Sequence, residues 1–384
     1  MNNFEYFCPT RLVFGKGSIA RLSDLVDKKQ KILMVYGGGS IKKNGVYQQV
    51  KEALRDYRLI EFSGLEPNPR YETCMRAVDV IKKNNVDFLL SVGGGSVLDG
   101  VKFIAGAAKY TGEDPYDILT KGVKIKEALP FGDVITLPAT GSEMNSNAVI
   151  SRESTNEKLL FSSEKVFPQF SIIDPETTFS LPLKQSINGV VDTFVHVMEL
   201  YCTYDVNTPL QDSWALGLLK TLTQEAPKII ENPHDYEARA NIFWCATCGL
   251  NYWIALGTVQ DWSTHMIGHE LTAFYGIDHA QSLAVVLPRL LIYQENGKRG
   301  KLAKLGRFVF DIKEPDDKKA ARKTIEAIET FFNMIGMDTK LSGYHINAQE
   351  AAEKIRERFE KRNVSFGEHH NINASAAYDI VKLC

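Results

Sequence analysis

The sequence predicts a two-domain protein, with a Rossmann-like α/β domain built on a parallel sheet followed by an all-α domain. Short β-rich runs alternate with helix-like runs up to about residue 180. From Leu181 onward, helical patterns follow one another with few β-branched runs. A chain of 384 residues is long enough to bury two hydrophobic cores. We therefore expect one domain at residues 1–180 and a second at residues 181–384.

Four segments of the first half are predicted to be strands, at residues 31–36, 86–92, 133–140 and 170–175. The runs KILMVY and VDFLLSV are almost entirely apolar, as expected of strands buried on both faces of a parallel sheet. Both lead directly into Gly-Gly-Gly-Ser, and the second such run opens a segment with helical spacing. Ligands of open parallel sheets bind beyond the carboxyl ends of the strands. The two glycine runs therefore mark the expected ligand site.

The second half is predicted to be helical, with Leu181-Pro182 as the boundary. The expected helices are residues 185–203, 209–230, 235–257, 261–275, 281–295, 317–335 and 348–361.

Charge and composition exclude several classes of protein. The formal net charge is −2, so no global basic field favours nucleic acid or an anionic membrane surface. No run of about 18 apolar residues occurs, which excludes a membrane-spanning helix. The first residues show no secretory pattern, and six cysteines in a chain of this length are no disulfide framework. We expect a cytoplasmic protein in which Cys245-x-x-Cys248 is core packing.

One carboxylate and four histidines form the strongest chemical pattern in the chain. Asp192 and His196 are spaced i, i+4 in a helical segment, which places both on one face. His265 and His269 repeat this spacing in a second helical segment. His279 follows a turn-like Gly-Ile-Asp and is expected to approach the others from a loop. Carboxylate and imidazole suit Zn²⁺ or Fe²⁺. The spacing alone leaves open which of the five residues binds the metal.

The two glycine runs favour a dinucleotide. Consecutive glycines allow close backbone approach and leave amide groups free for phosphate, and a helix N-terminus favours anions. Neither run is G-x-G-x-x-G, and the chain has no Walker A motif. Thr136, Thr140 and Ser142 follow the third predicted strand and could add hydroxyl donors to the same site, although such residues often cap the next helix.

The combination of these motifs resembles the iron-containing alcohol dehydrogenases, which are relatives of dehydroquinate synthase and glycerol dehydrogenase. The similar segments are GGGSVLDGVK, TLPATGSE, GVVDTFVHVMELY and QDWSTHMIGHELTAFYGIDHAQSLAVVLP. The resemblance covers essentially the whole chain and is strongest to bacterial NADPH-dependent aldehyde reductases and butanol dehydrogenases. It implies a dehydroquinate synthase-like architecture.

The resemblance also implies roles for individual residues. The metal ligands of the family fall on Asp192, His196, His265 and His279. His269 matches a histidine that lies near the nicotinamide and substrate without binding the metal, and it is the expected catalytic residue. The residues expected to bind the cofactor are Gly38, Gly39, Ser40, Gly94, Gly95, Ser96, Asp99, Thr136, Thr140, Ser142 and Lys158.

The first glycine run has a bearing on cofactor choice. NAD enzymes of the family often carry an Asp there, which accepts from the ribose 2′-hydroxyl and repels a 2′-phosphate. Residues 37–40 contain no carboxylate, and Lys42-Lys43 follow closely. We expect NADP(H).

The expected activity is the interconversion of aldehydes, such as butyraldehyde, and primary alcohols. A divalent metal, Fe²⁺ or Zn²⁺, would polarise the substrate oxygen while hydride passes to or from the nicotinamide. The resemblance also suggests a homodimer. The alternatives are a dehydroquinate synthase-like or glycerol dehydrogenase-like enzyme, a non-catalytic NADPH-binding protein and a metal hydrolase.

Overall fold

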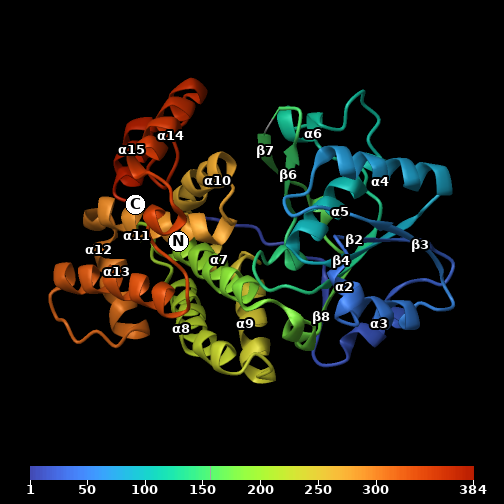
Figure 1. Cartoon of the computed structure of the whole chain (residues 1–384), viewed down its shortest axis with the longest axis horizontal. Coiled ribbons are helices and arrows are strands. Elements are labelled where there is room, and N and C mark those ends of the chain that lie inside the picture. Colours follow the sequence, from blue (N-terminus) through green and yellow to red (C-terminus); the bar gives the residue numbers. More distant parts are fainter. Residues whose placement is uncertain (156) are drawn as a thin grey trace. The chain divides into compact units, whose positions relative to one another are not determined.

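The computed structural model describes residues 1–155 and 157–384. By their internal contacts these residues form two compact units (Figure 1). One comprises Phe7–Leu181, and the other comprises Pro182–Cys384 together with Met1–Tyr6.

The unit Phe7–Leu181 is built on a six-stranded, fully parallel sheet with the order β1-β8-β5-β4-β2-β3. Its strands are β1 (Arg11–Phe14), β2 (Lys31–Tyr36), β3 (Arg58–Ser63), β4 (Phe88–Gly93), β5 (Phe131–Ile135) and β8 (Phe170–Ile173). The central strands β4 and β5 are buried along their whole length. Their apolar sequences are what a parallel sheet covered on both faces requires, which confirms the predicted α/β fold.

Helices and a small hairpin complete this unit. They are α1 (Leu22–Leu25), α2 (Ser40–Lys43), α3 (Val46–Ala53), α4 (Tyr71–Asn84), α5 (Gly95–Ala108), α6 (Asp117–Thr120) and the antiparallel pair β6 (Asn147–Arg152) and β7 (Glu157–Ser162). The hairpin packs on α5. Short 3₁₀ turns are η1 (Ser18–Arg21), η2 (Ser142–Met144), η3 (Glu164–Val166) and η4 (Pro175–Ser180).

Parallel registry aligns the strand ends at one edge of the sheet. Tyr36 of β2 pairs with Val92 of β4, and Gly93 pairs with Ile135 of β5. The strand predicted at residues 133–140 is β5, which ends at Ile135. The amide of Thr136 still donates to the carbonyl of Gly93 (2.9 Å), and Pro138, which has no N–H group, follows two residues later. The segments after β2, β4 and β5 therefore leave the sheet at the same edge.

The unit that begins at Pro182 is helical, as predicted. Its helices are α7 (Leu183–Tyr201), α8 (Pro209–Glu231), α9 (Tyr236–Gly249), α10 (Ser263–Tyr275), α11 (His279–Tyr293), α12 (Glu295–Val309), α13 (Asp317–Met334), α14 (Ala348–Arg362) and α15 (Ala374–Lys382), with 3₁₀ turns η5 (Trp253–Ala255) and η6 (Leu341–Tyr344). The helix predicted at 235–257 ends at Gly249 and is followed by η5, because Tyr252 adopts a left-handed conformation (φ 69°).

Helix α7 is the central element of the helical unit. It packs against α8, α9 and α11, and nearly all of its residues from Gly189 to Tyr201 are buried. A helix that is apolar on every side belongs in a core. A second cluster lies where α10 and α11 meet α14 and α15, around Ile267, Val286 and Phe359. Among the described residues, no helix combines the length and the apolar character needed to cross a membrane.

Candidate metal centre and cofactor loops

Helix α7 carries two of the five metal-ligand candidates, Asp192 and His196. The apolar residues around them fix this helix in the core, so their side chains share one face within the protein interior. Asp192 is 4% exposed and His196 is 6% exposed. Because a buried carboxylate is costly unless it is paired, these two residues need further partners.

Helix α10 carries His265 and His269, again one turn apart. His265 is buried and His269 is half-buried. Between them, Gly268 permits a close approach to α11, because a Cβ there would lie 3.0 Å from side-chain atoms of Leu283 and Ser282. The absence of a side chain at Gly268 thus brings the two histidine-bearing helices together.

His279 lies in a helix and not, as predicted, in a loop. It is the first residue of α11, and Asp278 before it is the N-cap. Asp278 and Gln281 form a capping box, in which the side chain of each residue accepts from the backbone of the other. This cap starts the helix one residue after the turn, so the ring of His279 is held by regular structure.

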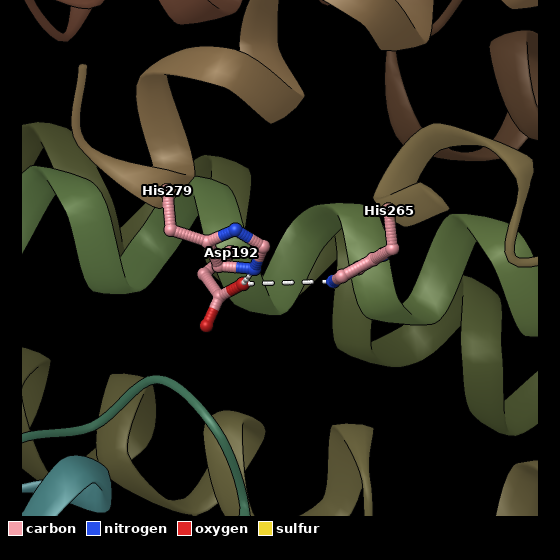
Figure 2. Close-up of side chains that lie close together, drawn as sticks. All are labelled: Asp192, His265 and His279. Carbon is pink, nitrogen blue, oxygen red and sulfur yellow. Dashed lines mark ion pairs between the residues drawn. The ribbon is translucent and has the colours of Figure 1, made fainter. Parts of the chain in front are cut away.

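The structure gathers Asp192, His265 and His279 around one point (Figure 2). One potential ligand atom from each lies within 4.8 Å of the others. The Nε2 atom of His265 lies 3.9 Å from Asp192 Oδ1, and that of His279 lies 3.6 Å from the same oxygen. The three side chains come from α7, α10 and α11, which contact one another.

The other two histidines lie against the same cluster. His196 Nε2 lies 3.8 Å from Asp192 Oδ1, and its ring stacks on that of His265 with centroids 4.6 Å apart. The ring of His269 lies 5.1 Å from that of His279 and 6.1 Å from that of His265. All five residues identified in the sequence are therefore neighbours, and three imidazole Nε2 atoms lie at similar distances from one carboxylate oxygen.

This arrangement fits a divalent cation. Asp192 Oδ1 and His265 Nε2 are both buried and lack a hydrogen-bond partner among the described residues. Ligands at about 2.0–2.2 Å from a tetrahedral metal lie roughly 3.3–3.6 Å from one another. The three distances from imidazole Nε2 to Asp192 Oδ1, 3.6–3.9 Å, exceed this spacing by only a few tenths of an ångström.

The surroundings of Asp192 favour the ionised form of its carboxylate. Burial alone would raise the pKa of Asp192, but the neighbouring imidazoles hold that pKa well below its ordinary value. Burial lowers the pKa of His196 to about 4. Burial would also lower the pKa of His265, but the carboxylates of Glu199 and Asp192 outweigh it and raise the pKa to about 9. The carboxylate is therefore ionised and available to a cation.

Glu199 is a further residue of this site that was not predicted from the sequence. Its carboxylate contacts Nδ1 of His265, on the side of the ring that faces away from Asp192. The signal was present, since Glu199 lies three residues after His196 and seven after Asp192, on the same face of an otherwise apolar helix.

Except for Lys158 on β7, the residues predicted to bind the cofactor follow the carboxyl ends of β2, β4 and β5 in the chain. Gly39 adopts a left-handed conformation (φ 97°) just before α2, where a side chain would be strained. In the second glycine run, Gly94 is the N-cap of α5, and Gly95 is its first residue. A Cβ at Gly95 would lie 2.4 Å from Thr140 Oγ1. The loop after β5 therefore touches the second glycine run.

Hydrogen bonds connect the predicted cofactor residues to one another. Asp99 accepts from the hydroxyl of Ser142 (2.8 Å), and Ser142 donates its amide to the hydroxyl of Thr140 (3.3 Å). Lys158 on β7 donates to Asn68 (2.9 Å), whose amide donates to the hydroxyl of Ser96 (3.4 Å). Thr136 is buried at the end of β5. The remaining residues of the set, Gly38 and Ser40, lie in the first glycine run at the end of β2.

Lys102 is a second residue that was not predicted from the sequence. It is fully buried in α5, and its ammonium donates to the hydroxyl and carbonyl of Ser142 (both 2.7 Å), to Asn145 (3.1 Å) and to the carbonyl of Asn147 (2.9 Å). Burial lowers the pKa of Lys102 to about 8. This side chain holds the loop after β5 against α5.

The chain combines two features: a parallel sheet with glycine runs at its carboxyl edge, and a helical unit that gathers a carboxylate and histidines. This combination defines a class of protein. The sequence profile described as iron-containing alcohol dehydrogenase matches residues 9–175, and the C-terminal profile of the same family matches residues 186–383. The chain belongs to the iron-containing alcohol dehydrogenase family.

Individual relatives are similar over their whole length. The NADPH-dependent aldehyde reductase YqhD of Escherichia coli is 48% identical, with 97% of each chain covered. A probable NADH-dependent butanol dehydrogenase of Bacillus subtilis is 41% identical over 100% of this chain and 99% of its own. The crystal structure of NADH-dependent butanol dehydrogenase A from Thermotoga maritima superposes with a TM-score of 0.94 at 36% identity, covering 100% and 98%. The family and fold expected from the sequence are thus confirmed.

Proposed function

We propose that this protein is an NADP(H)-dependent oxidoreductase that interconverts aldehydes and primary alcohols, with short- to medium-chain aldehydes such as butyraldehyde as substrates. Family membership supports the reaction class, and the similarity to an NADPH-dependent aldehyde reductase supports the direction and the cofactor. The observation that carries the proposal is the convergence of three imidazoles on Asp192 Oδ1 in a chain of this family.

The metal ligands in this proposal are Asp192, His196, His265 and His279. A divalent cation bound by them supplies a Lewis acid that polarises a carbonyl oxygen and favours the ionised form of an alcohol. The buried carboxylate provides the negative charge, and the imidazoles complete a set that suits both Fe²⁺ and Zn²⁺. Metal analysis of the purified protein decides between the two ions.

His269 is the proposed proton relay. Its ring lies beside those of His265 and His279, with centroids 6.1 Å and 5.1 Å away, which places an imidazole next to the proposed metal site. An imidazole titrates near neutral pH and can both give and accept the proton exchanged by the substrate oxygen.

His265 and His269 offer a matched pair of variants, because they lie one turn apart on α10. His265→Ala is expected to lose metal and activity together, and His269→Ala to keep the metal and lose turnover. Metal content and steady-state rates of both proteins test this. Full metal content in His265→Ala would refute the ligand assignment.

The cofactor is proposed to bind at the carboxyl edge of the sheet. Backbone amides of the second glycine run and the N-terminus of α5 suit its diphosphate, with Gly94, Gly95, Ser96 and Asp99 around it. Thr136, Thr140, Ser142 and Lys158 are proposed around its ribose and nicotinamide. The unit Phe7–Leu181 is then the dinucleotide-binding domain, and the unit that begins at Pro182 is the metal-binding domain.

The first glycine run, with Gly38, Gly39 and Ser40, is proposed to select NADP(H), because it carries no carboxylate that would repel a 2′-phosphate. Gly38 is the position for a test, because its Cβ would meet no atom within 4 Å, while Gly39 has a φ of 97°. Gly38→Asp is expected to move the ratio of kcat/KM for NADPH over NADH toward NADH. Gly38→Asn, which has the same shape without the charge, is the control. A wild-type ratio below one would refute the cofactor preference.

The decisive experiment is NADPH oxidation by the whole protein with a series of straight-chain aldehydes, before and after chelation and after metal is restored. We expect metal-dependent oxidation that requires aldehyde. Tight NADPH binding without turnover would instead indicate a non-catalytic binding protein, and oxidation of glycerol with NAD⁺ a glycerol dehydrogenase-like enzyme.

The homodimer is also a proposal. In the six-stranded sheet, β1 is an edge strand, and such a strand presents unpaired backbone groups to another chain. Phe14, the last residue of β1, is 41% exposed, and Phe7, which precedes that strand in the chain, is 53% exposed. Light scattering on the purified protein tests the assembly state. The cytoplasmic location stays a prediction.

A further inference from the structure

Helix α10 begins without a cap of its own. Its N-cap residue, Trp262, is in the left-handed region (φ 64°) and makes no side-chain cap hydrogen bond. A bulky residue in this conformation is strained and persists only where its surroundings enforce it. The first amides of a helix have no acceptor within the helix, so they need acceptors from elsewhere.

Glu199 of α7 supplies those acceptors from another helix. Its Oε1 accepts from the amide of Thr264 (2.5 Å) and from the amide of His265 (3.3 Å). Asp261 Oδ1 accepts from the amide of Ser263 (2.9 Å). A carboxylate is well placed at the start of a helix, where the peptide dipoles leave partial positive charge.

The second oxygen of the same carboxylate contacts Nδ1 of His265. An ionised carboxylate can only accept a hydrogen bond, so Nδ1 carries the proton. In the neutral ring the lone pair is then on Nε2, which is the atom that faces Asp192 Oδ1. Glu199 therefore fixes both the backbone at residue 265 and the tautomer of its ring.

In the described part of the chain, His196 has no contact equivalent to the one between Glu199 and Nδ1 of His265. Its Nδ1 atom is buried and has no hydrogen-bond partner among the residues that the structure describes. The two imidazoles stack on each other and face the same carboxylate oxygen of Asp192. The orientation of His196 thus depends on packing, while that of His265 depends on Glu199.

A buried ion cluster fixes the segment before α10. The amide of Asp261 donates to the carbonyl of Glu199 (3.0 Å). Lys298 of α12 donates to Asp261 Oδ2 (2.9 Å) and to Glu368 (2.7 Å), and all three side chains are almost fully buried. The start of α10 is therefore held from α7 and α12 at once, which leaves the ring of His265 little freedom.

We propose that Glu199 is a positioning residue for the metal centre. By accepting from the first turn of α10 and from Nδ1 of His265, it presents Nε2 of His265 to a divalent cation held at Asp192. Outer carboxylates of this kind fix the ring orientation and raise the basicity of the ligand nitrogen. This inference rests on the proposed function, since it assumes that His265 binds the metal.

The test is the affinity of the full-length protein for Zn²⁺, measured by isothermal titration after the protein has been stripped with a chelator. Glu199→Gln is expected to weaken Zn²⁺ binding by about tenfold to a hundredfold. The matched control is Glu270→Gln, which makes the same change on α10 at a buried carboxylate held by Arg358 and Arg362 (both 2.6 Å). This control is expected to keep the wild-type affinity for Zn²⁺.

A double variant separates an effect through His265 from a general effect on the fold. In the His265→Ala background, Glu199→Gln is expected to change the Zn²⁺ affinity less than about twofold, because the ring through which it acts is gone. An equal loss in both backgrounds would overturn the proposal. Circular dichroism checks folding, and Glu199→Asp serves if Glu199→Gln does not fold. The shorter side chain keeps the charge but withdraws it from the ring, so a loss of affinity is expected, and wild-type affinity would overturn the proposal.

The outcomes also distinguish this proposal from the proposed function. If the wild type does not bind Zn²⁺, or if His265→Ala binds it as the wild type does, the metal site itself is refuted. If His265→Ala weakens binding and Glu199→Gln does not, only the role of Glu199 is refuted.

Discussion

The contact between Gly95 and Thr140 allows a quantitative prediction for the cofactor loops. In Gly95→Ala the new Cβ would lie 2.4 Å from Thr140 Oγ1 and 2.8 Å from its Cγ2. Cβ contacts below 3.0 Å essentially never occur, so the two segments must separate by at least about 0.6 Å. Thr140 cannot retreat alone, because its hydroxyl accepts from the amide of Ser142.

We expect Gly95→Ala to lower the free energy of unfolding of the unit Phe7–Leu181 by about 1–3 kcal/mol, the usual cost of overpacking. For a domain of this size the melting temperature should fall by about 2–12 °C. Gly217→Ala on α8 is the control. Its Cβ would meet no atom within 4 Å, and alanine in a helix should add about 1 kcal/mol of stability.

The assay is denaturation followed by two signals. All four tryptophans lie between Trp214 and Trp262, so their fluorescence reports the helical unit, while far-ultraviolet circular dichroism reports both units. Gly95→Ala should shift the circular dichroism transition of the sheet unit. Adding Thr140→Ala removes the two closest atoms and should restore part of the loss. Wild-type stability in Gly95→Ala, or a double variant no more stable than Gly95→Ala, would refute this reasoning.

Three further predictions follow from buried charges. Zn²⁺ at a hundred times its Kd should stabilise the helical unit by about 2.7 kcal/mol, and a calorimetric shift that persists in Asp192→Asn would contradict the ligand set. Because burial lowers the pKa of Lys102 from 10.5 to about 8, the unfolded chain binds that proton more tightly than the folded chain. Relative to Lys102→Met, the wild type should therefore gain about 3 kcal/mol of unfolding free energy as the pH rises from 8 to 10.5, and parallel stability curves in denaturant would argue against it. Lys298→Met leaves the carboxylates of Asp261 and Glu368 buried without their cation. It should cost about 3–5 kcal/mol in denaturant titrations, and a loss below 1 kcal/mol would show that water reaches the cluster.

Much of the architecture could be predicted because local pattern and tertiary role agree. The apolar run at residues 31–36 is β2, residue for residue, and the helix expected at 209–230 is α8 with one residue more. The i, i+4 spacing of Asp192 with His196 also predicted a shared face correctly, because α7 is a regular helix.

Other elements could not be predicted from local sequence patterns, because tertiary contacts determine them. Helix α12 carries Gly297, Gly300 and Gly306 and has few apolar residues, so it was not predicted, yet it packs closely on α13. The edge strand β3 and the hairpin β6–β7 are only partly buried and lack a strong apolar run. In these segments tertiary contacts outweigh intrinsic propensity.

In the candidate site, too, local patterns were predictable and tertiary contacts were not. Residue types and spacing were sufficient to find Asp192 and the histidines. The position of Glu199 on the same helix face as Asp192 could be read from the sequence, but its pairing with His265, 66 residues away, and that of Lys102 with Ser142, 40 residues away, could not. His279 was expected in a loop because a single turn separates it from α10, whereas the Asp278 cap starts α11 there.

The distribution of Asp192, His265 and His279 over α7, α10 and α11 has a consequence for biosynthesis. A nascent chain that has emerged as far as residue 260 presents only Asp192 and His196 of the proposed ligands, because His265 and His279 lie further along the chain on α10 and α11. Under the proposed ligand set, the complete site can form only after residue 279 has left the ribosome, when about half of the helical unit has emerged. Translation products that end before residue 260 should therefore not bind transition metals at this site.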